Sequence, residues 1–158
     1  MLLAQVNVAR MRGPIDSPVM REFADGFDPV NQLADRAPGF VWRLQTGGHA
    51  PLVEDDEGLW VVNVSLWRDY EALHDFVYRS PHAAFLRRKS RWFEPAPPPT
   101  TALWWVDDDA RPDVPTARAR LVHLRRYGPT PQAFSLKRRF DERGRPVRRV
   151  PASSSRRS

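Results

Sequence analysis

Residues 59–93, LWVVNVSLWRDYEALHDFVYRSPHAAFLRRKSRWF, contain the clearest change of hydrophobic pattern in the chain. The first nine residues alternate as in a β-strand. One face is apolar and the other is mixed: Val62, Val64 and Leu66 against Val61, Asn63, Ser65 and Trp67. Because both faces carry apolar residues, we expect a central strand that is covered on both sides. The polar side chains on such a strand need hydrogen-bond partners.

The pattern changes to helical spacing after residue 67. Asp69 is a suitable N-cap, and the apolar stripe that follows has helical periodicity: Tyr70, Leu73, Phe76 and Val77. Ser80 and Pro81 then have the form of a cap followed by a first-turn proline. We therefore expect a second helix that begins near His82.

The rest of the chain supplies further strands and helices. Strands are predicted at residues 3–10, 40–46 and 102–106, and helices at 17–37 and 116–127, with a short edge strand at 132–136. Asp28 and Pro29 leave open whether residues 17–37 form two short helices or one kinked helix. The order is β-α-β-β-α-β plus a C-terminal helix, which is typical of an α+β, ferredoxin-like fold.

This topology makes two further predictions. The first and third strands of the β-α-β-β-α-β order are adjacent, so Asn7 and Asn63 should be near neighbours if the pairing register aligns their faces. One face of the sheet is left bare once the two crossover helices are placed. Because this face carries apolar residues, it needs a partner, and we expect a homodimer.

Length and composition limit the remaining alternatives. A chain of 158 residues indicates one domain, and the absence of cysteine excludes disulfides and thiolate metal sites. No apolar run is long enough to span a membrane and residues 1–10 do not resemble a signal peptide, so we expect a cytoplasmic protein. The acidic run at residues 54–57 is interpreted as a solvated hairpin tip and not as a cation site.

The net charge of +6 comes from the C-terminal segment. Residues 137–158 contain nine Lys and Arg against two Asp and Glu, so this segment carries +7 and the preceding 136 residues sum to −1. The folded part is therefore not basic, and specific nucleic-acid binding is not predicted. We assign residues 1–140 to one domain and residues 141–158 to a basic, disordered tail.

Several stretches together resemble one bacterial family of unknown function, number 3291 among the domains of unknown function. They are LAQVNVAR, DPVNQLADRAPGFVWRLQT, VNVSLWRDYEALHDFVYRSPHAAFLRRKSRWFEP, ALWWV and HLRRYGPTPQAFSL, and they extend over about residues 2 to 137. The resemblance implies a dimeric α+β barrel of the antibiotic biosynthesis monooxygenase type. It implies a small-molecule enzyme without metal or cofactor, acting on an aromatic or polyketide-like substrate.

Other members of the dimeric α+β barrel superfamily degrade or bind heme. Asn7 matches an Asn that the heme degraders use, but Phe76 stands where they have Trp, and His82 lies a turn before their His. A non-catalytic module that binds heme or another small molecule remains the alternative. A third hypothesis is a stress or assembly protein that acts through its basic tail.

The candidate catalytic residues are His82, Asn63 and Asn7. His82 is either a general base or a core histidine bonded to the backbone. Asn7 and Asn63, with Ser65, either stabilise an oxyanion or form a structural hydrogen-bond network.

The candidate substrate-binding residues are Trp42, Arg43, Ser65 and Trp67. The tryptophans either line a pocket for a hydrophobic or aromatic ligand or pack in the core. Arg43 binds either an anionic ligand or a carboxylate of the protein. No His-x-x-x-His spacing is present, and no metal site is predicted.

Overall fold

The computed structural model describes residues 1–79 and 88–148, without the side chains of residues 26–30. His82 therefore lies outside the described residues. The described part is an α+β structure with one six-stranded, antiparallel sheet, which confirms the predicted class.

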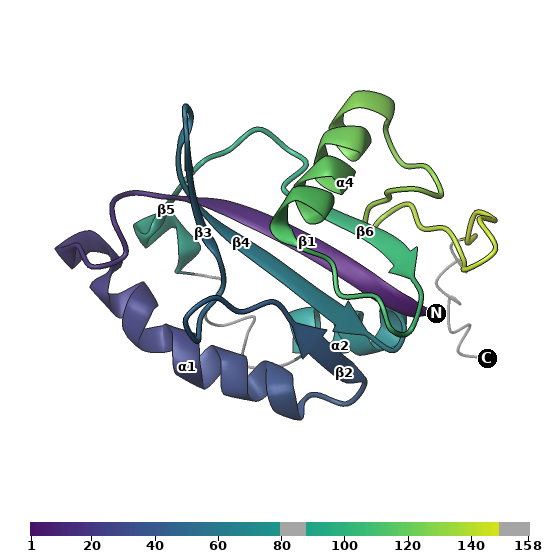
Figure 1. The fold of residues 1–158 in the computed structure, drawn as a ribbon, viewed down its shortest axis with the longest axis horizontal. Coiled ribbons are helices and arrows are strands. Elements are labelled where there is room, and N and C mark those ends of the chain that lie inside the picture. Colours follow the sequence, from purple (N-terminus) through teal and green to yellow (C-terminus); the bar gives the residue numbers. More distant parts are fainter. Residues whose placement is uncertain (80–87, 149–158) are drawn as a thin grey trace, which may run out of the picture.

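Two ten-residue strands, β1 (Leu2–Met11) and β4 (Gly58–Trp67), lie side by side at the middle of the sheet (Figure 1). The edge of β4 away from β1 pairs with β2 (Phe40–Arg43) and β3 (Leu52–Asp55). The edge of β1 away from β4 pairs with β5 (Phe93–Glu94) and β6 (Thr101–Val106). The predicted neighbourhood of the two asparagines is confirmed, because Asn7 and Asn63 are direct partners in the β1–β4 register.

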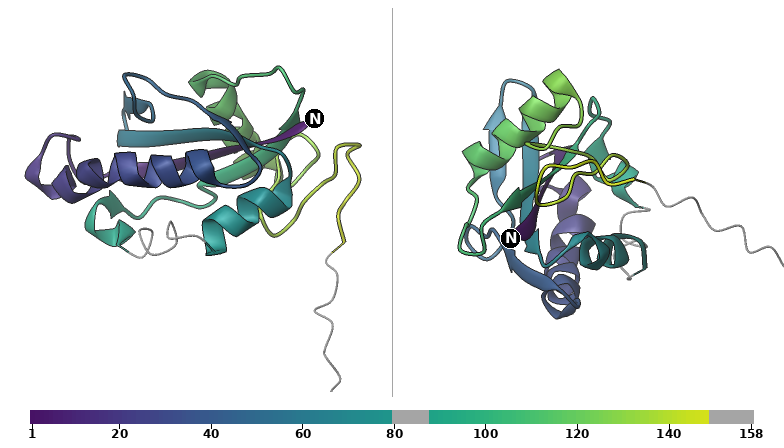
Figure 2. Two further views of the ribbon diagram at one scale, coloured as in Figure 1. Left: turned by 90° about the horizontal axis from the view of Figure 1, so that it is seen from below. Right: turned by 90° about the vertical axis from the view of Figure 1, so that its right-hand side faces the viewer.

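Helices cover both faces of this sheet (Figure 2). On one face lie α1 (Arg21–Arg36), which follows the 3₁₀ turn η1 (Pro18–Met20), and α2 (Tyr70–Arg79). On the other face lies α4 (Val114–Tyr127). A further 3₁₀ turn, η2 (Lys89–Arg91), precedes β5.

Local sequence signals explain the helix ends. Asp69 accepts a hydrogen bond from the Ala72 backbone N–H at 2.8 Å, which confirms it as a cap. Asp113 caps α4 in the same way through Thr116, and Gly128 ends α4 with a positive φ of 72°. The backbone of α1 is helical from Arg21 to Arg36, so the two short helices considered above are not formed.

The apolar sheet face is covered within the chain. Ala117, Leu121 and Leu124 of α4 pack onto the even-numbered side chains of the two central strands, which are fully or almost fully buried: Ala4, Val6, Val8, Trp60, Val62, Val64 and Leu66. This face therefore has a covering element within the chain, and the homodimer expected from its apolar residues stays a prediction. Alternation shows that a strand face is buried but not which element buries it.

Two regions differ from the sequence prediction. Strand β3 was not predicted, because it is only four residues long and two of them are charged. Its turn with β4 is the hairpin tip that was expected for the acidic run. Residues 141–148 were assigned to a disordered tail, whereas Asp141 closes a turn there by accepting bonds from the Arg143 and Arg145 backbone N–H groups. The rest of the predicted tail, 149–158, lies outside the described residues.

Candidate functional site

Five polar side chains form a row across the middle of the sheet, on the face that carries α1 and α2. They come from β1, β4 and β6, and we call them the polar row: Gln5, Asn7, Asn63, Ser65 and Thr101. Strand alternation brings them together, because Gln5 pairs with Ser65 and Asn7 pairs with both Asn63 and Thr101.

The polar row separates two apolar clusters on this face of the sheet. Toward one end, Leu3 and Trp67 pack with residues of α1 and α2. Toward the other end, Met11 and Val61 pack with Phe23 and other apolar residues. Between these clusters Asn63 is exposed, although both its neighbours in the strand are buried.

Hydrogen bonds satisfy most of the polar row. Asn7 Nδ2 donates to Thr101 Oγ1 at 2.7 Å, and Ser65 Oγ donates to Gln5 Oε1 at 3.0 Å. Asn63 makes no side-chain hydrogen bond to any residue that the structure describes. Its amide therefore offers both a donor and an acceptor to a ligand.

Arg43 lies beside the polar row, because β2 pairs it with Ser65. Its Nη2 is 3.3 Å from Asp35 Oδ2 on α1, so the salt bridge considered in the sequence is present. The Nε and Nη1 atoms are buried and have no hydrogen-bond partner among the residues that the structure describes. Unpaired guanidinium donors favour a negatively charged group or an ordered water in their neighbourhood.

The two tryptophans assigned to the site lie on opposite faces of the sheet, and only Trp67 is next to the polar row. Trp67 is 1% exposed and stacks on Phe76 with 5.1 Å between ring centroids, while its Nε1 donates to Ser65 Oγ at 2.9 Å. Trp67 is therefore a core residue that orients the row. Trp42 packs on the opposite face with the α4 cluster, 5.7 Å from the Arg111 guanidinium carbon, so it does not line the same site as Asn7 and Asn63.

Gln5 and Thr101 were missed by the sequence interpretation. The alternation of residues 3–10 already places Gln5 on the face of Asn7, so this signal was available. The sequence carried no signal for Thr101, since the fourth strand was predicted to begin at residue 102. Only the β1–β6 register brings Thr101 opposite Asn7.

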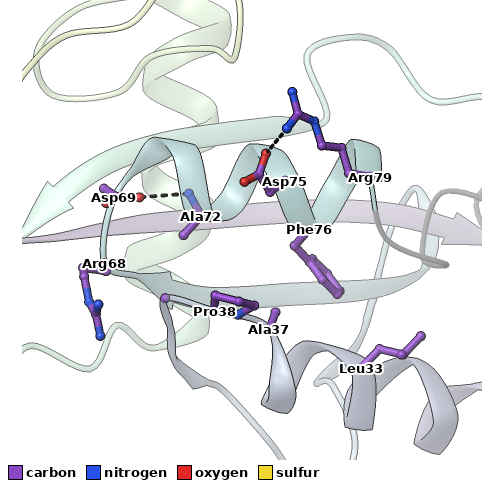
Figure 3. A pocket seen from close by; sticks show the side chains of 10 residues that line it. Leu33, Ala37, Pro38, Arg68, Asp69, Ala72, Asp75, Phe76 and Arg79 are labelled. Atoms are coloured by element: carbon purple, nitrogen blue, oxygen red, sulfur yellow. Dashed lines mark hydrogen bonds and ion pairs between the residues drawn. The ribbon is translucent and has the colours of Figure 1, made fainter.

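A groove of about 480 Å³ lies between the end of α1 and α2 (Figure 3). Leu33 and Phe76 contribute apolar surface, and Arg68, Asp75 and Arg79 are charged residues of its lining. None of the polar-row residues lines this groove. Phe76 connects the groove indirectly to the polar row, because it stacks on Trp67, which donates to Ser65.

A second polar network joins the β3–β4 hairpin to α4. Asp55 accepts hydrogen bonds from Trp60 Nε1 at 2.9 Å and from Arg118 Nη2 at 2.8 Å. Burial raises the pKa of Asp55, but these bonds and the one from the Glu57 backbone N–H outweigh it and hold the pKa below its ordinary value. Asp55 is therefore a structural carboxylate.

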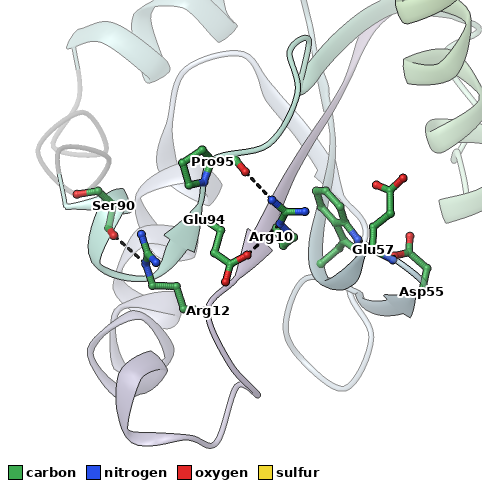
Figure 4. A network of polar contacts seen from close by, with 8 residues as sticks. Arg10, Arg12, Asp55, Glu57, Ser90, Glu94 and Pro95 are labelled. Carbon is green, nitrogen blue, oxygen red and sulfur yellow. Dashed lines mark hydrogen bonds and ion pairs between the residues drawn. The ribbon is translucent and has the colours of Figure 1, made fainter.

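Nearby, two arginines of the first strand and its continuation attach the segment 90–95 to the sheet (Figure 4). Arg10 Nη2 donates to the Pro95 carbonyl at 2.7 Å, and Arg12 Nε donates to the Ser90 carbonyl at 3.0 Å. Arg10 also lies over the Trp60 ring and 3.2 Å from Glu94. These contacts are within the protein, so we assign this network to stability.

A model of one protein family matches residues 2–150, and its description is Domain of unknown function (DUF3291). The chain belongs to this family. No curated protein matches the chain. The family description names no activity, so the chemistry of the site has to be argued from the residues.

In this DUF3291 member, the histidines that the structure describes make contacts within the protein. His49 Nδ1 lies 2.8 Å from the Ala50 carbonyl, and His123 Nε2 lies 2.9 Å from Thr130 Oγ1. No group of three or more His, Asp or Glu side chains suited to a metal ion occurs among the described residues. In the same part of the chain, no helix is long and apolar enough to cross a membrane.

Proposed function

We propose that the polar row is the binding site of a small aromatic or polyketide-like molecule with an enol, phenol or carbonyl oxygen. The observation that carries this proposal is Asn63, an exposed amide without a described partner in a central strand whose neighbouring residues are buried. Small-molecule sites combine apolar walls with a few placed polar groups. The two apolar clusters and the row between them have this composition.

As the activity, we propose a cofactor-free oxygenase or isomerase reaction, in line with the resemblance of the sequence to the antibiotic biosynthesis monooxygenases. Removal of a proton from an electron-rich ring leaves a carbanion whose charge is shared with the ring oxygen. The Asn63 amide would donate to that oxygen. Asn7 would hold β1 and β6 in register through its bond to Thr101. Arg43 would add positive charge beside the row.

One observation favours the alternative, a non-catalytic binding module. None of the five side chains of the polar row is of a type that titrates near neutral pH, so the row itself contains no general base. Catalysis would need a base from elsewhere, for which the sequence suggests His82, or from the substrate. Without one, the same surface binds its ligand and releases it unchanged.

The test is a panel of polycyclic phenols and hydroxyanthrones, with binding followed by tryptophan fluorescence and turnover followed by oxygen uptake. For an enzyme, we expect Asn63→Ala to lower turnover by about 10²-fold, because a donor to the developing oxyanion is lost. The matched control is Gln32→Ala, an exposed amide on α1.

The outcomes separate the two functions. The binding module is supported if the parent protein shows no turnover and Asn63→Ala weakens ligand binding. A hemin titration then shows whether heme is the ligand. If Asn63→Ala and Gln32→Ala both retain full ligand affinity and turnover, the polar row is not the site.

We also propose that the fold is ferredoxin-like and that two chains associate. The strand order β2-β4-β1-β6 and the two helices on one face support the first statement. The resemblance of the sequence to the dimeric α+β barrels supports the second statement, and since α4 packs on the apolar face, the two chains would associate through other surfaces. Sedimentation should show a dimer at micromolar concentration, and a monomer would rule the association out.

A further inference from the structure

A second groove, distinct from the polar row, lies between α2 and the segment 136–139. Its volume is about 580 Å³, which is in the range of small-molecule sites. Tyr70 Oη donates to the Leu136 carbonyl at 3.3 Å, and the Arg139 guanidinium carbon lies 3.6 Å from the Tyr70 ring centroid. These two contacts attach the segment to α2 and fix one side of the groove.

Three aromatic side chains of α2 follow one another at four-residue spacing along this groove. The ring centroids of Tyr70 and His74 are 5.7 Å apart, and those of His74 and Tyr78 are 4.6 Å apart. Tyr78 ends the series and is 56% exposed. An exposed ring that is supported from behind by a second ring offers a stacking surface to a planar ligand.

The charged lining gives this groove a free cation and a free acceptor. Asp75 is 3.6 Å from Arg79, so these two charges are paired. Lys137 and Glu71 are exposed and make no hydrogen bond or ion pair with the residues described. An ammonium group binds phosphate, and a carboxylate accepts hydrogen bonds from amino and hydroxyl groups.

We propose that this groove binds a nucleotide, with the base stacked on Tyr78, the phosphate at Lys137 and a donor of the ligand at Glu71. The inference goes beyond the proposed function, because it uses none of the polar-row residues. The same base and phosphate chemistry is offered by a free mononucleotide and by one unit of a single strand. Base-to-aromatic stacking is tolerant of sequence, so no preference among bases is built into the site.

The experiment is calorimetry on the full chain with AMP, adenosine and inorganic phosphate as separate probes at low ionic strength. We expect AMP to bind more tightly than either fragment, since only AMP uses both the ring and the cation. Tyr78→Ala should weaken AMP binding at least about fivefold, the lower end of a stacking contribution. Lys137→Gln should weaken AMP binding and leave that of adenosine unchanged.

The matched control is Tyr127→Ala on α4. Tyr127 is 60% exposed, lies 4.8 Å from the ring of His123 and stands 5.2 Å from the Arg126 guanidinium carbon, so it has the same kind of neighbours. It does not line the groove, and its replacement should leave AMP binding unchanged.

A ten-residue oligoadenylate distinguishes the two sources of the ligand. If the oligoadenylate binds more tightly than AMP and Tyr78→Ala removes this binding, the source is a single strand. If the oligoadenylate and AMP bind equally well, the source is the free nucleotide. The proposal is overturned if AMP does not bind, if phosphate binds as well as AMP, or if Tyr78→Ala and Tyr127→Ala have the same effect.

Discussion

Val62, Asn63 and Val64 are consecutive residues of β4, yet only the middle one reaches solvent. The valine side chains point to the α4 face and are 0% and 2% exposed. Asn63 points to the other face, between the two apolar clusters described above, and is exposed. One-residue alternation therefore separates the core from the candidate site within a single strand.

At the residue scale, Gly39 is predicted to resist substitution. Its φ is 81°, and a Cβ at this position would lie 2.5 Å from Ala72 Cβ on α2. We expect Gly39→Ala to lower the free energy of unfolding by about 2–4 kcal/mol, as backbone strain adds to overpacking. Urea denaturation measures this change.

Gly48→Ala is the control for the close approach at Gly39. Gly48 also has a positive φ, 86°, but no atom lies within 4 Å of the added Cβ. Its replacement should therefore cost only the strain, about 1–2 kcal/mol. Equal losses at both positions would show that the contact with α2 has no energetic consequence.

At the scale of elements, Asp55 connects three of them, because it lies on β3, accepts from Trp60 on β4 and pairs with Arg118 on α4. The pKa of Asp55 is lower in the folded chain than its ordinary value of 3.8. Its contribution to stability is thus present above the unfolded pKa and is lost as the pH falls through the folded pKa.

We therefore expect Asp55→Asn to destabilise the protein by about 1 kcal/mol at pH 7 and by less at pH 3. Urea denaturation at both pH values checks this, with the difference between parent and variant as the measured quantity. Asp56→Asn, at the exposed tip of the same hairpin, is the control. A difference that is constant with pH would contradict the assignment of Asp55 as the linking carboxylate.

At the scale of the whole molecule, the C-terminal segment is attached to the sheet as far as Phe140. Ala133 and Phe134 are buried, and the Phe134 backbone bonds to Leu103 of β6 in both directions at 2.8 Å. Trp105 Nε1 donates to the Phe140 carbonyl at 2.8 Å. Beyond it, residues 141–148 bond to one another and to Arg139.

A chain that ends at Phe140 should accordingly melt within about 2 °C of the full chain, since less than about 1 kcal/mol is lost. A chain that ends at Gln132 should melt much lower, because the buried pair and its bonds to β6 are removed. Differential scanning calorimetry compares the three chains. A large decrease in the melting temperature of the chain ending at Phe140 would mean that residues beyond Phe140 stabilise the folded domain.

Much of the local structure was predictable because its causes are local. Alternation identified the strands β1, β4 and β6, and the Asp69 and Gly128 signals bounded two helices. The expected fold order placed Asn7 and Asn63 on adjacent strands, and the register of β1 with β4 made them direct partners. These features depend on side-chain periodicity and backbone capping, which a short stretch of chain carries by itself.

The remaining features depend on contacts between distant segments. The sequence showed that Val62 and Val64 are buried, but only the tertiary structure decided that α4 covers them within the chain. It also decided that Trp42 and Trp67 lie on opposite faces, and that Arg43 pairs with Asp35 while its Nε and Nη1 have no partner among the described residues. The physical reason is that hydrophobic burial is non-directional, so a pattern records the burial of a face and not the identity of its partner.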